Sequence, residues 1–173
     1  NLQDEIEERA EVSLRPKTLD EYIGQSEATD EISKSENLAV DALINYKNMT
    51  AREKEVTIYL ESQIPAELPY ESTDLSIILG NLLDNAIEAT EKLEVEKDIF
   101  VSLRYQKEKL LIKVRNPYTG DLKKDRAGNY ISEKKDRENH GIGLKSVRKV
   151  VEKYEGVTEF HTEDQTFEVY VIL

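Results

Sequence analysis

Apolar residues recur at helical spacing in three parts of the chain. The first predicted helix covers about residues 37 to 53, the second begins with a cap near Thr73, and the third ends at Gly156. The positions that define the first and third helical faces are Ala39, Leu43, Tyr46 and Met49, then Leu144, Val147, Val151 and Tyr154. Alternation of apolar and polar residues predicts a strand at 56–61 and two hairpins, 99–105 with 110–115 and 158–162 with 166–173. Helices on one face of such a mixed, mostly antiparallel sheet make a two-layer α+β sandwich.

Residues 1–35 differ from the rest and are expected to form a separate helical lead-in before a domain at 36–173. Pro16 forbids one unbroken helix, so we expect a short charged helix before it and another from about Thr18 to Lys34. Their acidic, polar composition fits either solvated helices or half of a dimer contact.

The second predicted helix contains the segment NLLDNAIEA at residues 81–89. At 100° per residue, Asn81, Asn85 and Glu88 fall within about 60° of one another, whereas the other sides of the helix are apolar. We expect these three side chains to be buried, which a bound ligand would explain, because an amide suits Mg²⁺ and phosphate oxygens. The alternative is that both amides hydrogen-bond neighbouring backbone.

The third predicted helix begins in the segment NHGIGLKSVRKVVEKYEG, which places Gly141 and Gly143 at its mouth. Glycines there let backbone N–H groups approach a phosphate, and the helix dipole adds about 0.3–1 kcal/mol of anion stabilisation. A glycine-rich turn that caps an ordinary helix has the same pattern, so this segment alone does not distinguish a phosphate site from a helix cap.

Together, the two segments resemble the ATP-binding domain of the gyrase, Hsp90, histidine kinase and MutL (GHKL) ATPases. Within that family, the chain is most similar over about residues 36–173 to sensor histidine kinases of the peptide quorum-sensing type. The resemblance implies a Bergerat-type ATP-binding fold, ATP and Mg²⁺ as cofactors, Asn85 as the metal ligand, and Asn81 as a phosphate and metal-shell contact. It also implies that the segment HGIGL covers the phosphates, through His140, Gly141, Ile142, Gly143 and Leu144.

The first glycine box of the family is relaxed here to VRNPYTG. The resemblance places Asn116 where an Asp usually contacts adenine, and Gly120 is the surviving glycine. The side-chain oxygen of Asn116 can accept from the adenine amino group, although turn chemistry beside Pro117 is an equal alternative.

The interval 119–139 lacks apolar periodicity and is expected to be a mobile lid. Its basic residues could offset the repulsion that an acidic protein offers to ATP, and Lys134 aligns best with a family lysine; the alternative is a solvated loop. Of the two histidines, His140 is expected to border the phosphates and His161 to be structural.

The residue at position 81 bears on whether the site hydrolyses ATP or transfers its phosphoryl group. Hydrolysing members of the family carry a glutamate there as general base, whereas Asn81 cannot take a proton at neutral pH. Phosphoryl transfer to a histidine needs no such base, because imidazole is already nucleophilic. The family places its acceptor histidine upstream, and this chain has none there. The expected partners are therefore a histidine-bearing dimerisation domain and a downstream response regulator, with a possible homodimer through the N-terminal helices. A regulatory nucleotide-binding module and an ATP hydrolase are the alternative functions.

The composition narrows the partners and the cellular compartment that we expect for this protein. With a net charge of −12 in 173 residues, the chain is not expected to bind nucleic acid or an anionic membrane. The absence of cysteine suits a reducing cytoplasm. Because the sequence begins at Asn1 without methionine and has no long apolar run, we expect a truncated, cytoplasmic part of a membrane-bound sensor kinase.

Residues 5–28 carry a second resemblance, to the lead-in of the motor domain of the bacterial Holliday-junction branch-migration helicase. No phosphate-binding GxxxxGK[ST] motif follows, so no helicase function is implied. Tyr22 and Ile23 also fit the second dimerisation helix of quorum-sensing kinases. A fusion remnant, chance and a diverged dimerisation helix all remain open.

Overall fold

The computed structural model describes residues 31–119, 123–124, 126–127, 130–131 and 137–173, with the backbone alone for 123–124, 130–131 and 137–142. The chain divides after residue 31 into two units, and nearly all the described residues belong to the second, residues 32–173. The helices predicted before residue 31 lie outside the described residues. Residues 31–34, which were expected to end the second of them, are not helical.

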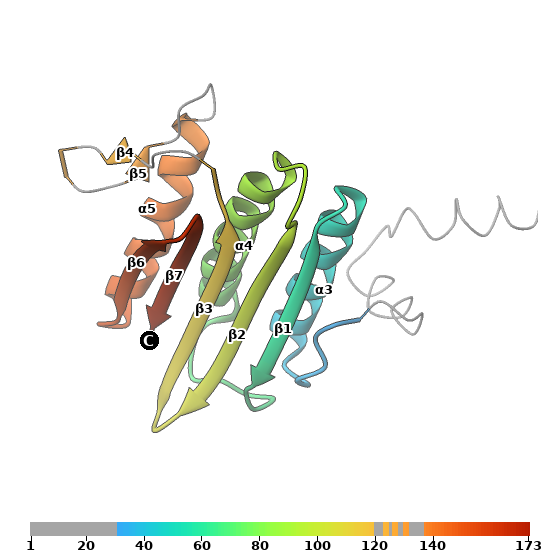
Figure 1. Cartoon of the computed structure of the whole chain (residues 1–173). Helices are drawn as coiled ribbons and strands as arrows, with labels where there is room; N and C mark the ends of the chain where they lie inside the picture. The colour runs from blue at the N-terminus through green and yellow to red at the C-terminus, as the bar shows by residue number, and fades with distance from the viewer. Residues whose placement is uncertain (1–30, 120–122, 125, 128–129, 132–136) are drawn as a thin grey trace, which may run out of the picture. The chain divides into compact units, whose positions relative to one another are not determined.

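Five strands form one mixed sheet in the order β1-β2-β3-β7-β6. The strands are β1 (Thr57–Gln63), β2 (Asp98–Gln106), β3 (Lys109–Pro117), β6 (Val157–Glu163) and β7 (Thr166–Ile172). Strand β1 runs parallel to β2, and the other neighbours are antiparallel. Three helices, α3 (Leu38–Glu53), α4 (Ser72–Glu91) and α5 (Arg137–Lys153), cover one face of this sheet (Figure 1). The predicted two-layer α+β sandwich is confirmed.

Both predicted hairpins are present, with two-residue turns. Lys107 and Glu108 have φ values of 51° and 60°, and Asp164 and Gln165 have 48° and 61°. Positive φ at both central residues is the geometry of a type I′ turn, whose twist matches that of the flanking strands. Neither turn contains glycine, and the antiparallel pairing of each hairpin continues to the residues that flank its turn.

The core lies between α4 and the inner face of the sheet. Among the described elements, helix α4 contributes more of the buried apolar side chains than any other, and strands β2 and β3 supply the facing layer. The central members are Leu75, Ile78, Leu79, Leu82, Leu83, Ile87, Ile99, Leu103 and Ile112. In the described part of the chain, none of the helices combines the length and apolarity that a membrane crossing needs.

Helix α3 packs with a different face from the one predicted. Val40, Ile44 and Ala51 are buried, whereas Tyr46 of the predicted face is 52% exposed. The reason is a buried amide: the Asn45 side chain accepts from the N–H groups of residues 32 and 33 and donates to the Ser33 carbonyl. With Asn45 buried in this contact, its neighbour Ile44 is buried in the core.

The end of α5 also differs in detail from the prediction. Glu155, not Gly156, adopts the left-handed conformation that ends the helix, with φ 55°. Gly156 donates its N–H to the Val151 carbonyl at 2.9 Å. A Cβ at Gly156 would lie 2.3 Å from the Ile172 carbonyl oxygen, so glycine is required there for close approach to β7.

Candidate functional site

Helices α4 and α5 pack against each other in opposite directions, and this packing joins the two predicted motifs. The start of α4 contacts the end of α5, where Lys153 Nζ lies 2.7 Å from Asp74 Oδ2. Further along α4, a Cβ built on Gly143 of α5 would lie 3.0 Å from Asn81 Oδ1. Gly143 therefore makes room for the Asn81 side chain, and the two segments singled out by sequence meet in space.

The glycines occupy a different part of the helix from the one expected. Because α5 begins at Arg137, Gly141 and Gly143 lie after its first turn and not at its mouth. An α-helix leaves only the N–H groups of its first turn without intrahelical partners. The amides of the two glycines thus belong to the hydrogen-bonded part of the helix, and what the structure shows for Gly143 is a close helix contact.

Asn81 is oriented from two sides. Its Nδ2 donates to the Ile77 carbonyl of its own helix at 2.7 Å, and its Oδ1 faces Gly143. The Asn81 amide thus donates to neighbouring backbone, which is the alternative to a ligand-binding role that the sequence left open. The half-buried amide is held in one orientation at the α4–α5 contact.

Asn85 lies one turn further along α4. The prediction that Asn81, Asn85 and Glu88 are buried is wrong, because all three are half-exposed. Among the residues that the structure describes, the Asn85 side chain has no hydrogen-bond partner, and the residue is half-exposed. No group of three His, Cys, Asp or Glu side chains that could hold a metal occurs in that part of the chain. An amide oxygen together with phosphate oxygens is a donor set that fits Mg²⁺.

Asn116 lies at the end of β3, a strand that packs against α4, and is 4% exposed. Its Nδ2 donates to the Pro117 carbonyl at 2.8 Å, which is the local turn chemistry considered for this residue. This bond uses the donor end of the amide and fixes its orientation. The adenine contact stays a prediction.

The remaining predicted residues are only partly described. Gly120 and Lys134 lie outside the described residues, as do the side chains of His140 and Ile142. Leu144 is half-buried against the core. Of the interval 119–139 that was predicted as a mobile lid, the last three residues belong to α5, and β4 (Lys123–Lys124) pairs with β5 (Tyr130–Ile131) within it; the lid itself stays a prediction.

Comparison with known protein families identifies the family of this domain. The model of the GHKL domain matches residues 70–173, which include α4, the sheet from β2 onward and α5. The chain belongs to the GHKL family. No curated protein matches it.

Solved structures agree with this GHKL assignment at the level of fold. The nucleotide-free catalytic domain of histidine kinase ThkA is similar with a TM-score of 0.59 and 18% identity, over 81% of this chain and 92% of that one. A second nucleotide-free form of the same domain gives 0.61. Full-length ShkA in complex with AMPPNP gives 0.62 at 18% identity, over 89% of this chain and 34% of that one.

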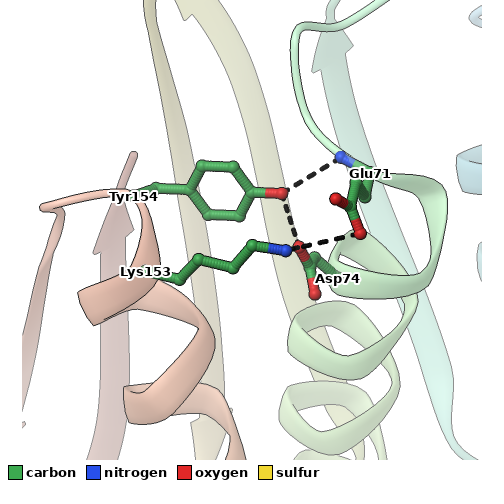
Figure 2. Close-up of polar contacts among 4 residues, drawn as sticks. All are labelled: Glu71, Asp74, Lys153 and Tyr154. Carbon is green, nitrogen blue, oxygen red and sulfur yellow. Dashed lines mark hydrogen bonds and ion pairs between the residues drawn. The ribbon is translucent and has the colours of Figure 1, made fainter.

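The GHKL domain also contains a polar cluster that sequence reasoning missed, at the other end of the α4–α5 contact (Figure 2). Asp74 accepts from Lys153 Nζ at 2.7 Å and from the Tyr154 hydroxyl at 2.5 Å. The Tyr154 hydroxyl accepts in turn from the Glu71 N–H at 3.1 Å, and Lys153 Nζ lies 3.3 Å from Glu71 Oε2. A sequence signal existed, because Asp74 lies one heptad before Asn81 on the same stripe of the helix.

Electrostatics in this cluster follow from its contacts. The hydrogen bonds from Lys153 and Tyr154 hold the pKa of Asp74 below its usual value. Hydrogen bonding to Asp74 raises the pKa of Lys153, and burial followed by the bond to Asp74 raises that of Tyr154. At neutral pH the cluster therefore contains an ionised Asp74, a charged Lys153 and a neutral Tyr154.

Proposed function

We propose that this GHKL domain binds ATP with Mg²⁺ and acts as the catalytic domain of a sensor histidine kinase. In this proposal it transfers the γ-phosphoryl group to a histidine on a dimerisation helix that the chain does not contain. The observation that carries the proposal is the contact between Asn81 of α4 and Gly143 of α5. It brings the amide-bearing motif and the glycine motif of the family to one place.

Each side chain has a defined part in this proposal. Asn85, whose amide makes no hydrogen bond among the described residues, contributes its oxygen to Mg²⁺. Asn81, held by Ile77 and Gly143, contacts phosphate oxygens and the metal shell. Bound Mg²⁺ neutralises charge on the triphosphate. The protein's own groups fix the position of the phosphoryl group relative to the incoming histidine.

The chemistry at position 81 favours transfer over hydrolysis. A carboxamide does not accept a proton at neutral pH, so Asn81 cannot activate water as a general base. A neutral imidazole needs no activation, and positioning with charge stabilisation is sufficient for phosphoryl transfer to it. This chemistry supports a kinase over an ATP hydrolase.

The adenine end of the nucleotide is assigned to Asn116. Because its Nδ2 is bonded to the Pro117 carbonyl, Oδ1 is the atom that remains to accept a hydrogen bond from the adenine amino group. An uncharged acceptor gives a weaker bond than the aspartate usual in the family.

The wider setting is part of the same proposal. The partners are a histidine-bearing dimerisation domain and a response regulator, in a cytoplasmic two-component signalling pathway of the quorum-sensing type. A second candidate function, a nucleotide-binding module that regulates a partner without transfer, is favoured by the relaxed first glycine box around Asn116.

One experiment separates these functions. The protein is mixed with γ-labelled ATP, Mg²⁺ and a separate dimerisation fragment that carries the acceptor histidine. Acid-labile label on the fragment supports the kinase, and its loss with a His→Gln fragment is the control. Nucleotide binding without transfer supports the regulatory module, and release of labelled inorganic phosphate supports a hydrolase. Absence of nucleotide binding would overturn the proposal as a whole.

A further inference from the structure

The contact between α4 and α5 has two ends, and the polar cluster lies at the end away from Asn81. Asp74 and Asn81 are seven positions apart on α4, and Tyr154, the residue that follows α5, is eleven positions after Gly143. Both spacings return to nearly the same side of a helix, within about 20°. The cluster and the Asn81–Gly143 contact are therefore on one continuous helix interface.

Most of that interface is apolar and gives little information about register. Val147 and Val151 of α5 pack into the same core cluster as Leu75, Ile78 and Leu82 of α4. Apolar contacts are non-directional, so they specify the shift of one helix along the other less sharply than hydrogen bonds do. Directional hydrogen bonds at one end of the interface sharpen that register.

The cluster supplies those directional bonds. The Asp74 side chain is 11% exposed and accepts bonds from two successive residues at the end of α5. Glu71 is the N-cap residue of α4 and makes no side-chain cap. Its backbone N–H donates instead to the Tyr154 hydroxyl (Figure 2). The end of α5 is thus bonded to both backbone and side chain of the first turn of α4.

Tyr154 is itself fixed by its surroundings. Its ring packs edge to face against Tyr70, with centroids 5.2 Å apart, and the Tyr70 hydroxyl lies 3.3 Å from the Leu173 carbonyl oxygen. Edge-to-face packing of this kind restricts ring orientation. The hydroxyl of Tyr154 is therefore presented at one place relative to the sheet.

We propose that Asp74, Lys153 and Tyr154 are positioning residues for nucleotide binding, which fix the register of α5 along α4 and so place Gly143 against Asn81. This inference rests on the proposed function, because it concerns binding at that same site. A shift of α5 toward its own N-terminus or C-terminus would bring a residue with a side chain toward Asn81 in place of Gly143. The amide that contacts the phosphates would then be displaced.

The test compares four variants with the wild type for affinity to Mg·AMPPNP by calorimetry at 10 °C. Lys153→Met removes the ion pair from a side chain that is 49% exposed, so the variant should fold; Lys153→Arg preserves the charge. Lys54→Met removes the 3.0 Å ion pair with Glu91, which joins α4 to α3 and not to α5. Tyr154→Phe is the second disruptive variant.

The expected result is a rise in Kd of about three- to thirtyfold for Lys153→Met and Tyr154→Phe, the range for coupling between packed elements. Lys153→Arg should restore most of the affinity, and Lys54→Met should bind as the wild type does. In ¹H–¹⁵N spectra, the Gly143 amide should shift in Lys153→Met and not in Lys54→Met.

Two results would overturn the inference. If the disruptive variants have lower melting temperatures but wild-type Kd values and unmoved Gly143 resonances, the cluster is structural only, and the proposed function is unaffected. If the wild-type protein does not bind Mg·AMPPNP, the proposed function fails and this inference fails with it.

Discussion

The substitution Gly143→Ala tests the helix contact at the centre of the site. A Cβ at this position would lie 3.0 Å from Asn81 Oδ1, 3.6 Å from its Cγ and 3.8 Å from its Cβ. The first distance is shorter than ordinary van der Waals contact, so the Asn81 side chain must move by a few tenths of an ångström. Any such movement disturbs its bond to the Ile77 carbonyl, which measures 2.7 Å.

The effects of Gly143→Ala on stability should nearly cancel. Alanine is favoured over glycine inside a helix by about 0.5–1 kcal/mol. A weakened hydrogen bond costs about 0.5–1.5 kcal/mol. The net change in the free energy of unfolding is therefore expected to stay within about 1 kcal/mol of the wild type, as measured by urea denaturation.

Nucleotide affinity should change much more than stability. A hydrogen bond to a charged group contributes about 1.5–3 kcal/mol, so loss of the contact between Asn81 and phosphate should raise the Kd for Mg·ATP about tenfold or more. Gly80→Ala is the matched control, since a Cβ there has nothing within 4 Å. It should stabilise α4 and leave the Kd unchanged. A Gly143→Ala protein with wild-type affinity would refute the assignment of this contact to the phosphates.

Three further outcomes follow from the same structure. Asn85→Ala should abolish the Mg²⁺-dependent part of ATP affinity in calorimetry with and without EDTA; equal Mg²⁺ dependence in both proteins would remove the metal assignment. Gly156→Ala should lower the free energy of unfolding by about 1–3 kcal/mol or more, because its Cβ would lie 2.3 Å from backbone, and an unchanged urea midpoint would contradict this. Asp74 has a pKa below its ordinary 3.8 in the folded state, so the unfolded state binds more protons between the two values and stability rises with pH there. The wild type should therefore lose stability as the pH falls through this window, and Asp74→Asn should show a smaller acid dependence; identical pH profiles would exclude the contribution.

Local pattern was sufficient for much of the fold. The two hairpins, the strand after α3 and the core helix α4 were all predictable, because their apolar spacing agrees with how they pack. The buried face of α3 was not predictable, since two overlapping apolar stripes fit its sequence. The choice between them depends on the Asn45 side chain, which bonds to residues 32 and 33 in a contact that periodicity does not record.

The residues of the candidate site could be predicted from the sequence, but their contacts with one another could not. Sequence indicated Asn81 and Gly143 separately, and their contact appears only when α4 and α5 pack. The start of α5 was placed one turn too late, because a glycine pair normally indicates a turn and helix propensity is weak beside tertiary packing. The heptad spacing of Asp74 and Asn81 marks one side of α4, but the partners of Asp74 lie 79 and 80 positions away, so a single sequence does not pair them.

A crystal structure of the protein with Mg²⁺ and a nonhydrolysable ATP analogue tests the nucleotide site most directly. We expect a metal ion about 2.0–2.1 Å from the Asn85 amide oxygen. We also expect the triphosphate between Asn81 and the N-terminal half of α5, and the adenine near Asn116. Well-ordered nucleotide bound elsewhere, with Asn81 and Asn85 making no contact to metal or phosphate, would contradict the assignment of this site to ATP.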